Sequence, residues 1–191
     1  MIDSVLTFIA NYVNSQLKLT FGLTEDKVIA SSLINLDGTV TDNIENKVII
    51  SLINIEHETF AANTGQYQQA GGTQYGKVEQ PVYLNLYLVF AANYNSSNYI
   101  ESLKMLSATI ACIQANPAFD IKEFPDLDPS TPRLSFEIHN LPINELSHIW
   151  NGIGAKYVPS IIYKVRMLTI QKSMMKSSIS GVTGIGTSTS T

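Results

Sequence analysis

The stretch that decides the fold runs from Gln80 to Phe119, and it opens with Pro81-Val82-Tyr83-Leu84-Asn85-Leu86-Tyr87-Leu88-Val89-Phe90-Ala91. This half is rich in aliphatic and aromatic side chains, and Asn85 is the one polar break in it. Successive side chains of a strand point to opposite faces, so both faces are apolar here. The pattern predicts a central strand that is covered on both sides.

The second half of the stretch changes to the spacing of a helix. Apolar side chains recur every three or four residues, at Ile100, Leu103, Leu106, Ile110 and Ile113. They form one stripe that is expected to face the sheet. Asn95 and Ser96 are the expected N-cap residues, and Pro117 follows the helix and ends it. A buried strand followed by an amphipathic helix is the core of a layered domain.

The rest of the chain follows the same two periodicities. Helical spacing predicts an N-terminal helix over residues 2–17 and a short helix between Asn140, its expected N-cap, and Gly154. Alternating or continuous apolar runs predict strands over residues 27–36, 47–58, 133–140 and 159–171. The sequence therefore predicts an α+β fold of layered type, with a mixed sheet of about five strands and three flanking helices.

Two segments carry no helical or strand period. Residues 60–79 are rich in Gln, Gly and Tyr, and they form either a floppy hairpin loop or an arm that orders against a neighbour through Tyr67 and Tyr75. Residues 117–132 contain four prolines and are expected to form a solvated surface loop. Residues 1–172 are expected to form one domain, and residues 173–191 a flexible tail rich in Ser, Thr and Gly.

Charge is scarce and unevenly distributed in these 191 residues. Charged residues make up 15% of the chain, against roughly a quarter in a usual soluble domain. Residues 1–128 carry a net charge of −8 and residues 129–191 a net charge of +4. This split is either ordinary fluctuation or the mark of subunits that meet head to tail. The net charge of −4 gives no basic footprint for nucleic acid, and no apolar run reaches the roughly 20 residues of a membrane span.

The sequence lacks the motifs of an enzyme or a metal protein. Neither the three histidines nor the single cysteine, Cys112, stands in a zinc or nucleophile pattern. A role for His139, His148 or Cys112 in catalysis is an alternative, with inert packing or surface positions as the expected outcome. Glu56 and Glu58 share a strand face and are expected to be solvated at the end of the strand. We predict no catalytic residue, no cofactor and no metal.

Two stretches resemble a known family. They are Pro81–Ala92 with Tyr99-Ile100-Glu101-Ser102-Leu103, and Ile149-Trp150-Asn151-Gly152-Ile153-Gly154-Ala155-Lys156-Tyr157-Val158-Pro159-Ser160 leading into Tyr163–Met167. Both resemble the cap, or tail-terminator, proteins of phage-like contractile injection systems of the virulence-cassette and antifeeding-prophage type. The likeness covers about residues 1–172, and Trp-x-x-x-Gly-x-x-Tyr-x-Pro-Ser is its most specific run.

The resemblance implies a structural assembly protein that is not an enzyme. Such a protein forms a homo-oligomeric ring, typically a hexamer, which ends the inner tube and contacts the last sheath layer at the end distal to the baseplate. It would be made in the cytoplasm and become part of the particle. The alternative outside catalysis is a monomeric protein-binding module that uses the segment 60–79.

The charge split and the resemblance together predict interface residues. We expect Lys156, Lys164 and Arg166 to approach acidic groups of a neighbouring subunit, the tube or the sheath. The acidic candidates are Glu56, Glu58, Glu101 and the loop from Asp120 to Asp128. Trp150 has a different predicted role, which is to anchor the short helix in the core against Tyr157 or the sheet.

Overall fold

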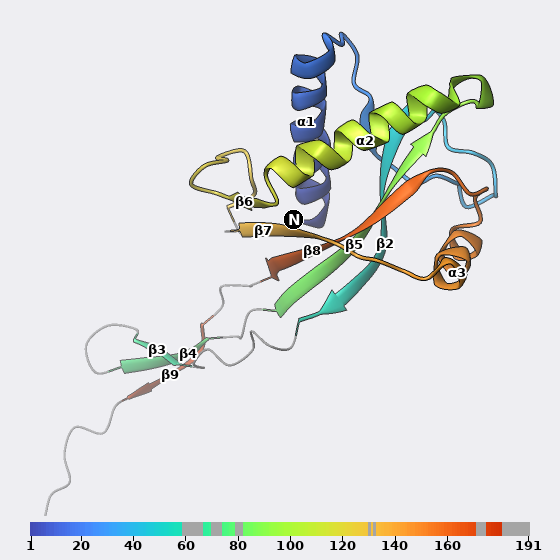
Figure 1. Cartoon of the computed structure of the whole chain (residues 1–191). Helices are drawn as coiled ribbons and strands as arrows, with labels where there is room; N and C mark the ends of the chain where they lie inside the picture. The colour runs from blue at the N-terminus through green and yellow to red at the C-terminus, as the bar shows by residue number, and fades with distance from the viewer. Residues whose placement is uncertain are drawn as a thin grey trace, which may run out of the picture.

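A mixed sheet of six strands is the centre of the molecule, in the order β1-β2-β5-β8-β7-β6 (Figure 1). The structure is a computed structural model that describes residues 1–58, 67–69, 74–78, 82–129, 131, 133–170 and 175–180. The strands are β1 (Val28–Ala30), β2 (Lys47–His57), β5 (Val82–Asn93), β6 (Ala118–Asp120), β7 (Arg133–Ile138) and β8 (Ser160–Ile170). The predicted fold class is confirmed, with one strand more than the five expected.

Strand β5 lies between β2 and β8 and pairs antiparallel with both. Leu88 and Val89 are adjacent residues of β5, so their side chains point to opposite faces of the sheet, and both are fully buried. The prediction of a central strand covered on both sides is therefore confirmed. β1 is the one strand of this sheet that runs parallel to its partner, and it touches β2 only over Val48–Ile50.

Two helices cover one face of the sheet, α1 (Ile2–Phe21) and α2 (Tyr99–Ala115), the latter preceded by the 3-10 turn η1 (Ser96–Asn98). The larger core lies between them and the sheet, and its fully buried members include Val5, Val13, Val48, Leu86, Leu88, Phe90 and Leu134. Helix α1 ends at Gly22, which has φ 64°. Glycine adopts this left-handed conformation without the strain that a Cβ causes, so it stops the helix there.

The third helix, α3 (Ile143–Ile153), covers part of the opposite face. A smaller core lies beneath it and consists of Leu33, Ile44, Ile49, Val89, Ala91, Trp150 and Ile162. Trp150 is 3% exposed, and its ring centroid lies 5.5 Å from that of Tyr157 in an edge-to-face contact. The predicted anchoring role of Trp150 is thus confirmed. Gly154 ends the helix at φ 76°, as expected.

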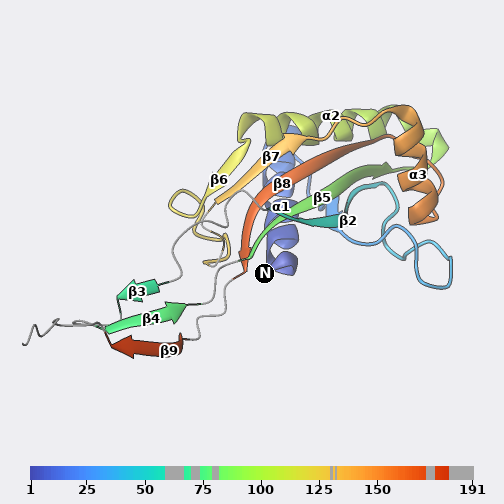
Figure 2. The ribbon, with the colours of Figure 1, turned by 90° about the horizontal axis from the view of Figure 1, so that it is seen from below.

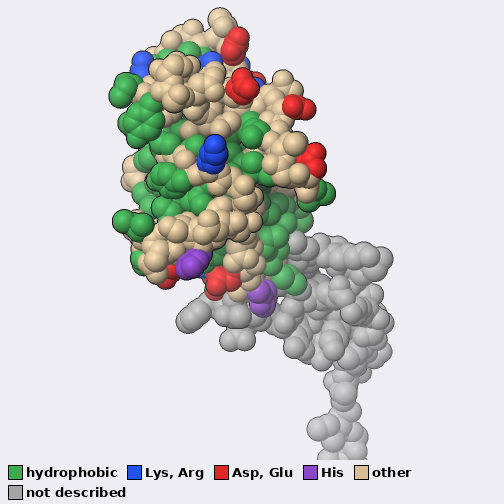
Figure 3. Space-filling model, turned by 90° about the vertical axis from the view of Figure 1, so that its right-hand side faces the viewer, with side chains coloured by type: hydrophobic (Ala, Val, Ile, Leu, Met, Phe, Trp, Pro, Cys, Tyr) green, Lys and Arg blue, Asp and Glu red, His purple; other side chains and the backbone are tan. Residues whose placement is uncertain are grey.

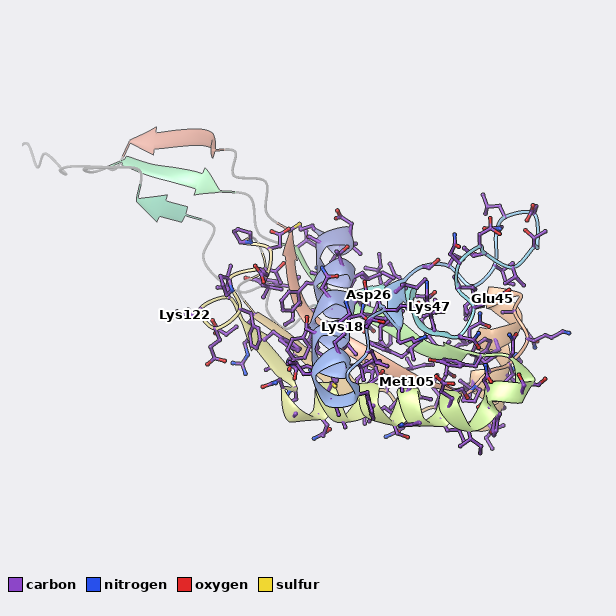
Figure 4. All side chains as sticks on the ribbon, turned by 90° about the horizontal axis from the view of Figure 1, so that it is seen from above. Lys18, Asp26, Glu45, Lys47, Met105 and Lys122 are labelled. Atoms are coloured by element: carbon purple, nitrogen blue, oxygen red, sulfur yellow. The ribbon has the colours of Figure 1, made fainter. Side chains whose placement is uncertain are left out.

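A buried amide on α1 holds β1 in place. The Nδ2 of Asn14 donates to the carbonyl oxygen of Val28 at 2.7 Å, and its Oδ1 accepts from the backbone N–H groups of Lys27 and Val28, each at 2.9 Å. At the surface, Lys18 and Asp26 form an ion pair at 2.7 Å between α1 and the segment that leads to β1 (Figure 4). The Asn14 side chain therefore supplies three hydrogen bonds at the start of β1, which has no strand on its outer side among the described residues.

The strand expected over residues 27–36 is shortened to Val28–Ala30. The Oγ of Ser32 donates to the carbonyl oxygen of Ile34 at 2.6 Å, so a local bond replaces the sheet there. The chain then makes the predicted turn at Asp37-Gly38, where the Asp37 carboxylate accepts from the backbone N–H of Thr39 at 2.9 Å. Local side-chain bonding explains why the longer strand prediction was wrong.

The connection over residues 117–132 is more than the solvated loop that was expected. Its first residues form β6, which pairs with β7 at the edge of the sheet. Phe119 is 1% exposed and stands edge-to-face with Phe8, Tyr12, Phe124 and Phe136 at centroid distances of 4.8–5.6 Å. Leu127 is also buried in the larger core. The apolar residues between the prolines therefore pack this segment against α1 and β7.

The buried face of α2 is rotated about the helix axis relative to the predicted apolar stripe. Its buried residues are Ser102, Met105, Leu106, Thr109 and Ile113, whereas Ile100 is 77% exposed. Ser102 donates through Oγ to the carbonyl oxygen of Tyr99 at 2.6 Å, and Thr109 through Oγ1 to that of Met105 at 2.9 Å. Because both hydroxyls are satisfied inside the helix, they can be buried, and a count of apolar residues alone misplaces the face.

A second sheet contains β3 (Tyr67–Gln69), β4 (Gln74–Val78) and β9 (Met175–Ser180), in the order β3-β4-β9 (Figure 2). The first two strands lie in the segment that was expected to be a long hairpin loop, and β9 lies in the expected flexible tail. β4 pairs antiparallel with both neighbours. Strand pairing uses backbone groups that any residue except proline supplies, which is why composition did not indicate these strands.

Candidate assembly surfaces

The part of the sheet that α3 leaves uncovered carries a row of charged side chains. Glu56 on β2 accepts from the Nζ of Lys164 on β8 at 2.7 Å, and from the Oη of Tyr87 on β5 at 2.8 Å. The Lys164 ammonium also lies 5.3 Å from the centroid of the Tyr87 ring. Three neighbouring strands thus each contribute one group to a single cluster.

The row continues with a second ion pair. The guanidinium of Arg166 on β8 lies 2.9 Å from a carboxylate oxygen of Glu137 on β7, and both side chains are exposed. Lys164 also faces Glu137 in the register of the two strands. This face of β8 is therefore partly exposed. The structure pairs both cations within one subunit, so any contact with a neighbour must compete with these internal pairs.

The electrostatics of the row follow from its hydrogen bonds. The bond from Lys164, followed by that from Tyr87, lowers the pKa of Glu56 below its ordinary 4.5. The bond to Glu56 raises the pKa of Lys164 above its ordinary 10.5. Both groups therefore remain charged over the neutral range. Exposed ion pairs of this kind add little to stability.

The predicted interface residues are not all in one place. Glu58 accepts a hydrogen bond from Asn85 at 2.9 Å beside the row. Lys156 is exposed in the connection from α3 to β8, and Glu101 is exposed in the first turn of α2 across the sheet. Tyr67 belongs to β3 and Tyr75 to β4. The structure thus brings together Glu56, Glu58, Lys164 and Arg166, and separates them from the other four.

A groove of about 1160 Å³ runs beside the row, between the first turns of α1, the end of β1, strand β2 and helix α3. Figure 3 shows hydrophobic side chains between polar ones on this side of the molecule. Its floor includes Leu52 and Ile53, and its rim includes Glu145 of α3. Pockets for small ligands usually hold about 300–1,000 Å³, so this groove is large enough for a peptide segment.

The residues of the catalytic alternative lie on opposite faces of the sheet. His139 and His148 both line it, and the His139 ring stands edge-to-face with Tyr87 at 4.9 Å. Cys112 packs against the larger core on the other face of the sheet, and burial raises the pKa of its thiol. The structure therefore does not bring the thiol to the two histidines. No group of three or more His, Cys, Asp or Glu suited to a metal ion occurs among the described residues.

Several exposed apolar side chains were missed as contact candidates. They lie near turns and at the first or last turn of a helix, and they include Leu19, Leu36, Ile100 and Ile143. Leu36 directly precedes the turn at Asp37-Gly38, and an apolar side chain at such a position was a usable signal. Within the described part of the chain, no helix combines the length and the apolar character needed to cross a membrane.

The described surface thus carries a charged row, a groove and single exposed apolar side chains, on a mixed sheet with helices on both faces. The chain belongs to the family of Pvc16 N-terminal domains, whose model matches residues 4–183. The family resemblance inferred from the sequence is thereby confirmed. The match also reaches past residue 172, where the resemblance was expected to end.

Two solved structures share the fold. A sheath/tube terminator from an extracellular contractile injection system, PVC, in the extended state, superposes with a TM-score of 0.68 at 13% identity. The tube-terminating cap of the anti-feeding prophage superposes with a TM-score of 0.62 at 14% identity. The alignments cover 100% and 96% of this chain but 64% and 61% of those proteins. A search of curated protein sequences finds no match.

Proposed function

We propose that this chain is a structural assembly protein that terminates the inner tube and sheath of a contractile injection system at the end distal to the baseplate. The observation that carries the proposal is the family match over residues 4–183, and the shared fold with two tube-terminating proteins supports it. The chain acts without catalysis and without a cofactor. It is made in the cytoplasm and then becomes part of the assembled particle.

A ring is the assembly that this role implies. A terminator must bind the tube through one face and offer no site for further growth on the other. Subunits that meet head to tail use two different patches, and these contacts close into a ring when the rotation between subunits allows it. The uneven charge along the chain, −8 over residues 1–128 and +4 over residues 129–191, is the sequence feature that favours contacts between two different patches. We propose a homo-oligomeric ring, a hexamer, whose partners are the tube and sheath proteins.

The test is deletion of the gene, with particles examined by electron microscopy. We expect sheath–tube particles of uncontrolled length, or particles that fall apart, because nothing stops the addition of tube subunits. A copy of the gene supplied in trans should restore fixed length. Normal particles of fixed length in the deletion strain would overturn the proposal. Light scattering of the purified protein tests the ring separately, and a monomer at high concentration would contradict it.

A further inference from the structure

Strand β2 has an open edge over half of its length. β1 covers the edge only as far as the pair of Ala30 with Ile50. From Leu52 to His57, β2 has β5 on one side and no strand on the other among the described residues. An open edge of this kind is a template for another strand, and proteins usually cover or blunt it.

The backbone of this edge is available for pairing. The N–H of Glu58 donates to the carbonyl oxygen of Tyr83 at 2.8 Å, so the backbone of residue 58 faces β5. Backbone groups alternate in direction along a strand, so Glu56 also faces β5, and Ile55 and His57 face outward. The Ile55 side chain is 43% exposed. The groove described above lies along Leu52, Ile53 and Asn54.

The same chain contains a second strand edge that has no partner among the described residues. β9 is an edge strand of the second sheet, and its six residues are about as long as the open run Leu52–His57. The two edges do not pair with each other within one chain. A strand edge that is open on both partners, in two different patches, is the arrangement that head-to-tail assembly requires.

Charge favours the same pairing. The charged side chains that line the groove are Asp3 and Glu145, and the lining contains no Lys or Arg. Asp3 also binds the amino group of Met1 at 2.6 Å, so Glu145 is more available than Asp3 for a contact with another chain. Residues 171–191, which include β9, carry Lys172 and Lys176 and no Asp or Glu, and Lys176 lies within β9. An acidic groove and an acid-free donor segment attract each other.

We propose that β9 of one subunit adds to the open edge Leu52–His57 of β2 in a second copy of this chain. The second sheet then extends the six-stranded sheet of its neighbour, and backbone hydrogen bonds hold the two subunits together. The inference rests on the ring of the proposed function and names the contact that builds it. It assigns the donor to the C-terminal segment and the acceptor to the groove beside α3.

The experiment is cross-linking between two populations of the full-length chain. Each population carries Cys112→Ala, and one then carries Ile55→Cys and the other Ser178→Cys. The two are mixed and treated with a short bismaleimide. We expect a cross-linked dimer in the mixture, and a much weaker one in either population alone. Ser147→Cys is the matched control for the acceptor, because Ser147 is exposed on α3 but does not line the groove.

A second variant tests the same edge without new thiols. Ile55→Pro removes an N–H that faces away from β5, so no bond inside the sheet is lost. We expect the melting temperature to stay close to that of the parent, while light scattering shows at least a tenfold weaker association. If Ile55→Pro unfolds the chain, the outward direction assigned to Ile55 is wrong and the proposal falls with it.

The outcomes separate this inference from the proposed function. A ring that forms and caps tubes without a 55–178 cross-link overturns the inference and leaves the function standing. A specific 55–178 cross-link in a protein that does not bind tubes supports the inference and removes the function. Equal cross-linking at position 147, or a protein that stays monomeric, would each overturn the inference.

Discussion

At the scale of single residues, Trp150 stabilises α3 more than any other side chain of that helix. It is the one buried residue of α3, and it joins the helix to the sheet. We predict that Trp150→Ala lowers the free energy of unfolding by about 3–5 kcal/mol, because it leaves a cavity in the smaller core. Urea denaturation followed by circular dichroism measures the effect. A denaturation midpoint equal to that of the parent would contradict the burial of Trp150.

The pair of Glu56 and Lys164 makes a prediction about pH. The pKa of Glu56 is lowered, so its contribution to stability is present above its ordinary pKa and disappears as the pH falls through the lowered value. The pKa of Lys164 is raised, so its contribution is present below 10.5 and disappears as the pH rises through the raised value. The pair therefore stabilises the fold between these two limits.

We predict that Lys164→Met lowers the urea midpoint slightly at about pH 7 and that the difference from the parent closes at an acid pH below the lowered pKa of Glu56, where the carboxylate is protonated. Lys156→Met is the control, since no ion pair involves Lys156 among the described residues. The effect is small because both partners are partly exposed. A difference that is the same at both pH values would show that the lost packing of the lysine, and not its charge, is responsible.

At the scale of elements, Asn14 decides whether β1 joins the sheet. Its side chain is 6% exposed and satisfies three backbone groups of the segment Lys27–Val28. A buried polar group that loses its partner costs about 1–3 kcal/mol. We predict that Asn14→Ala destabilises the chain by at least about 2 kcal/mol, measured by thermal or urea unfolding. Asn11→Ala, at an exposed position of the same helix, should change stability by less than about 0.5 kcal/mol.

The helices and strands also show how much of the fold could be predicted from the sequence. The bounds of strands β2, β5 and β8 were predicted to within a few residues, because a long run of apolar residues fits few structures other than a buried strand. The face of α2 was misplaced because Ser102 and Thr109 are buried with hydroxyls bonded to their own helix. Strand β6 was missed because residues 117–132 are rich in proline, and because the burial of Phe119 depends on rings elsewhere in the chain, those of Phe8, Tyr12 and Phe136.

The predicted interface residues illustrate a different limit. Sequence identified charged positions on β2 and β8, and the structure shows Glu56 bonded to Lys164. It could not show that the two belong to one subunit, since a spacing of 108 positions in the chain carries no information about distance. The open edge of β2 was equally hidden, because strand order in a sheet follows from tertiary packing.

At the scale of the whole molecule, the charge split predicts a dependence of assembly on salt. Replacing Lys164→Glu and Arg166→Glu together reverses two cations of the basic part of the chain. We predict weaker ring formation and tube capping at low salt. The Debye length falls from about 10 Å at 0.1 M to about 3 Å at 1 M, so the difference from the parent should shrink at high salt.

The internal ion pairs require a control for this prediction. The quadruple variant Glu56→Lys, Glu137→Lys, Lys164→Glu and Arg166→Glu restores an opposite charge to each cation site within one subunit. If charges contact a neighbouring subunit, the tube or the sheath, the quadruple variant still assembles poorly at low salt. If it assembles as well as the parent, the row acts only within a subunit and the predicted interface role is wrong.

The division of the hydrophobic interior by the sheet has an optical consequence. The chain contains one tryptophan, and it lies in the smaller core under α3. Its emission therefore reports the detachment of α3, whereas far-ultraviolet ellipticity reports the helices α1 and α2 and the sheet. The smaller core buries fewer side chains, so α3 is expected to detach at lower denaturant than the rest. The two signals would then give separate midpoints, and the chain would pass through a species that keeps its sheet but has lost one wall of the groove.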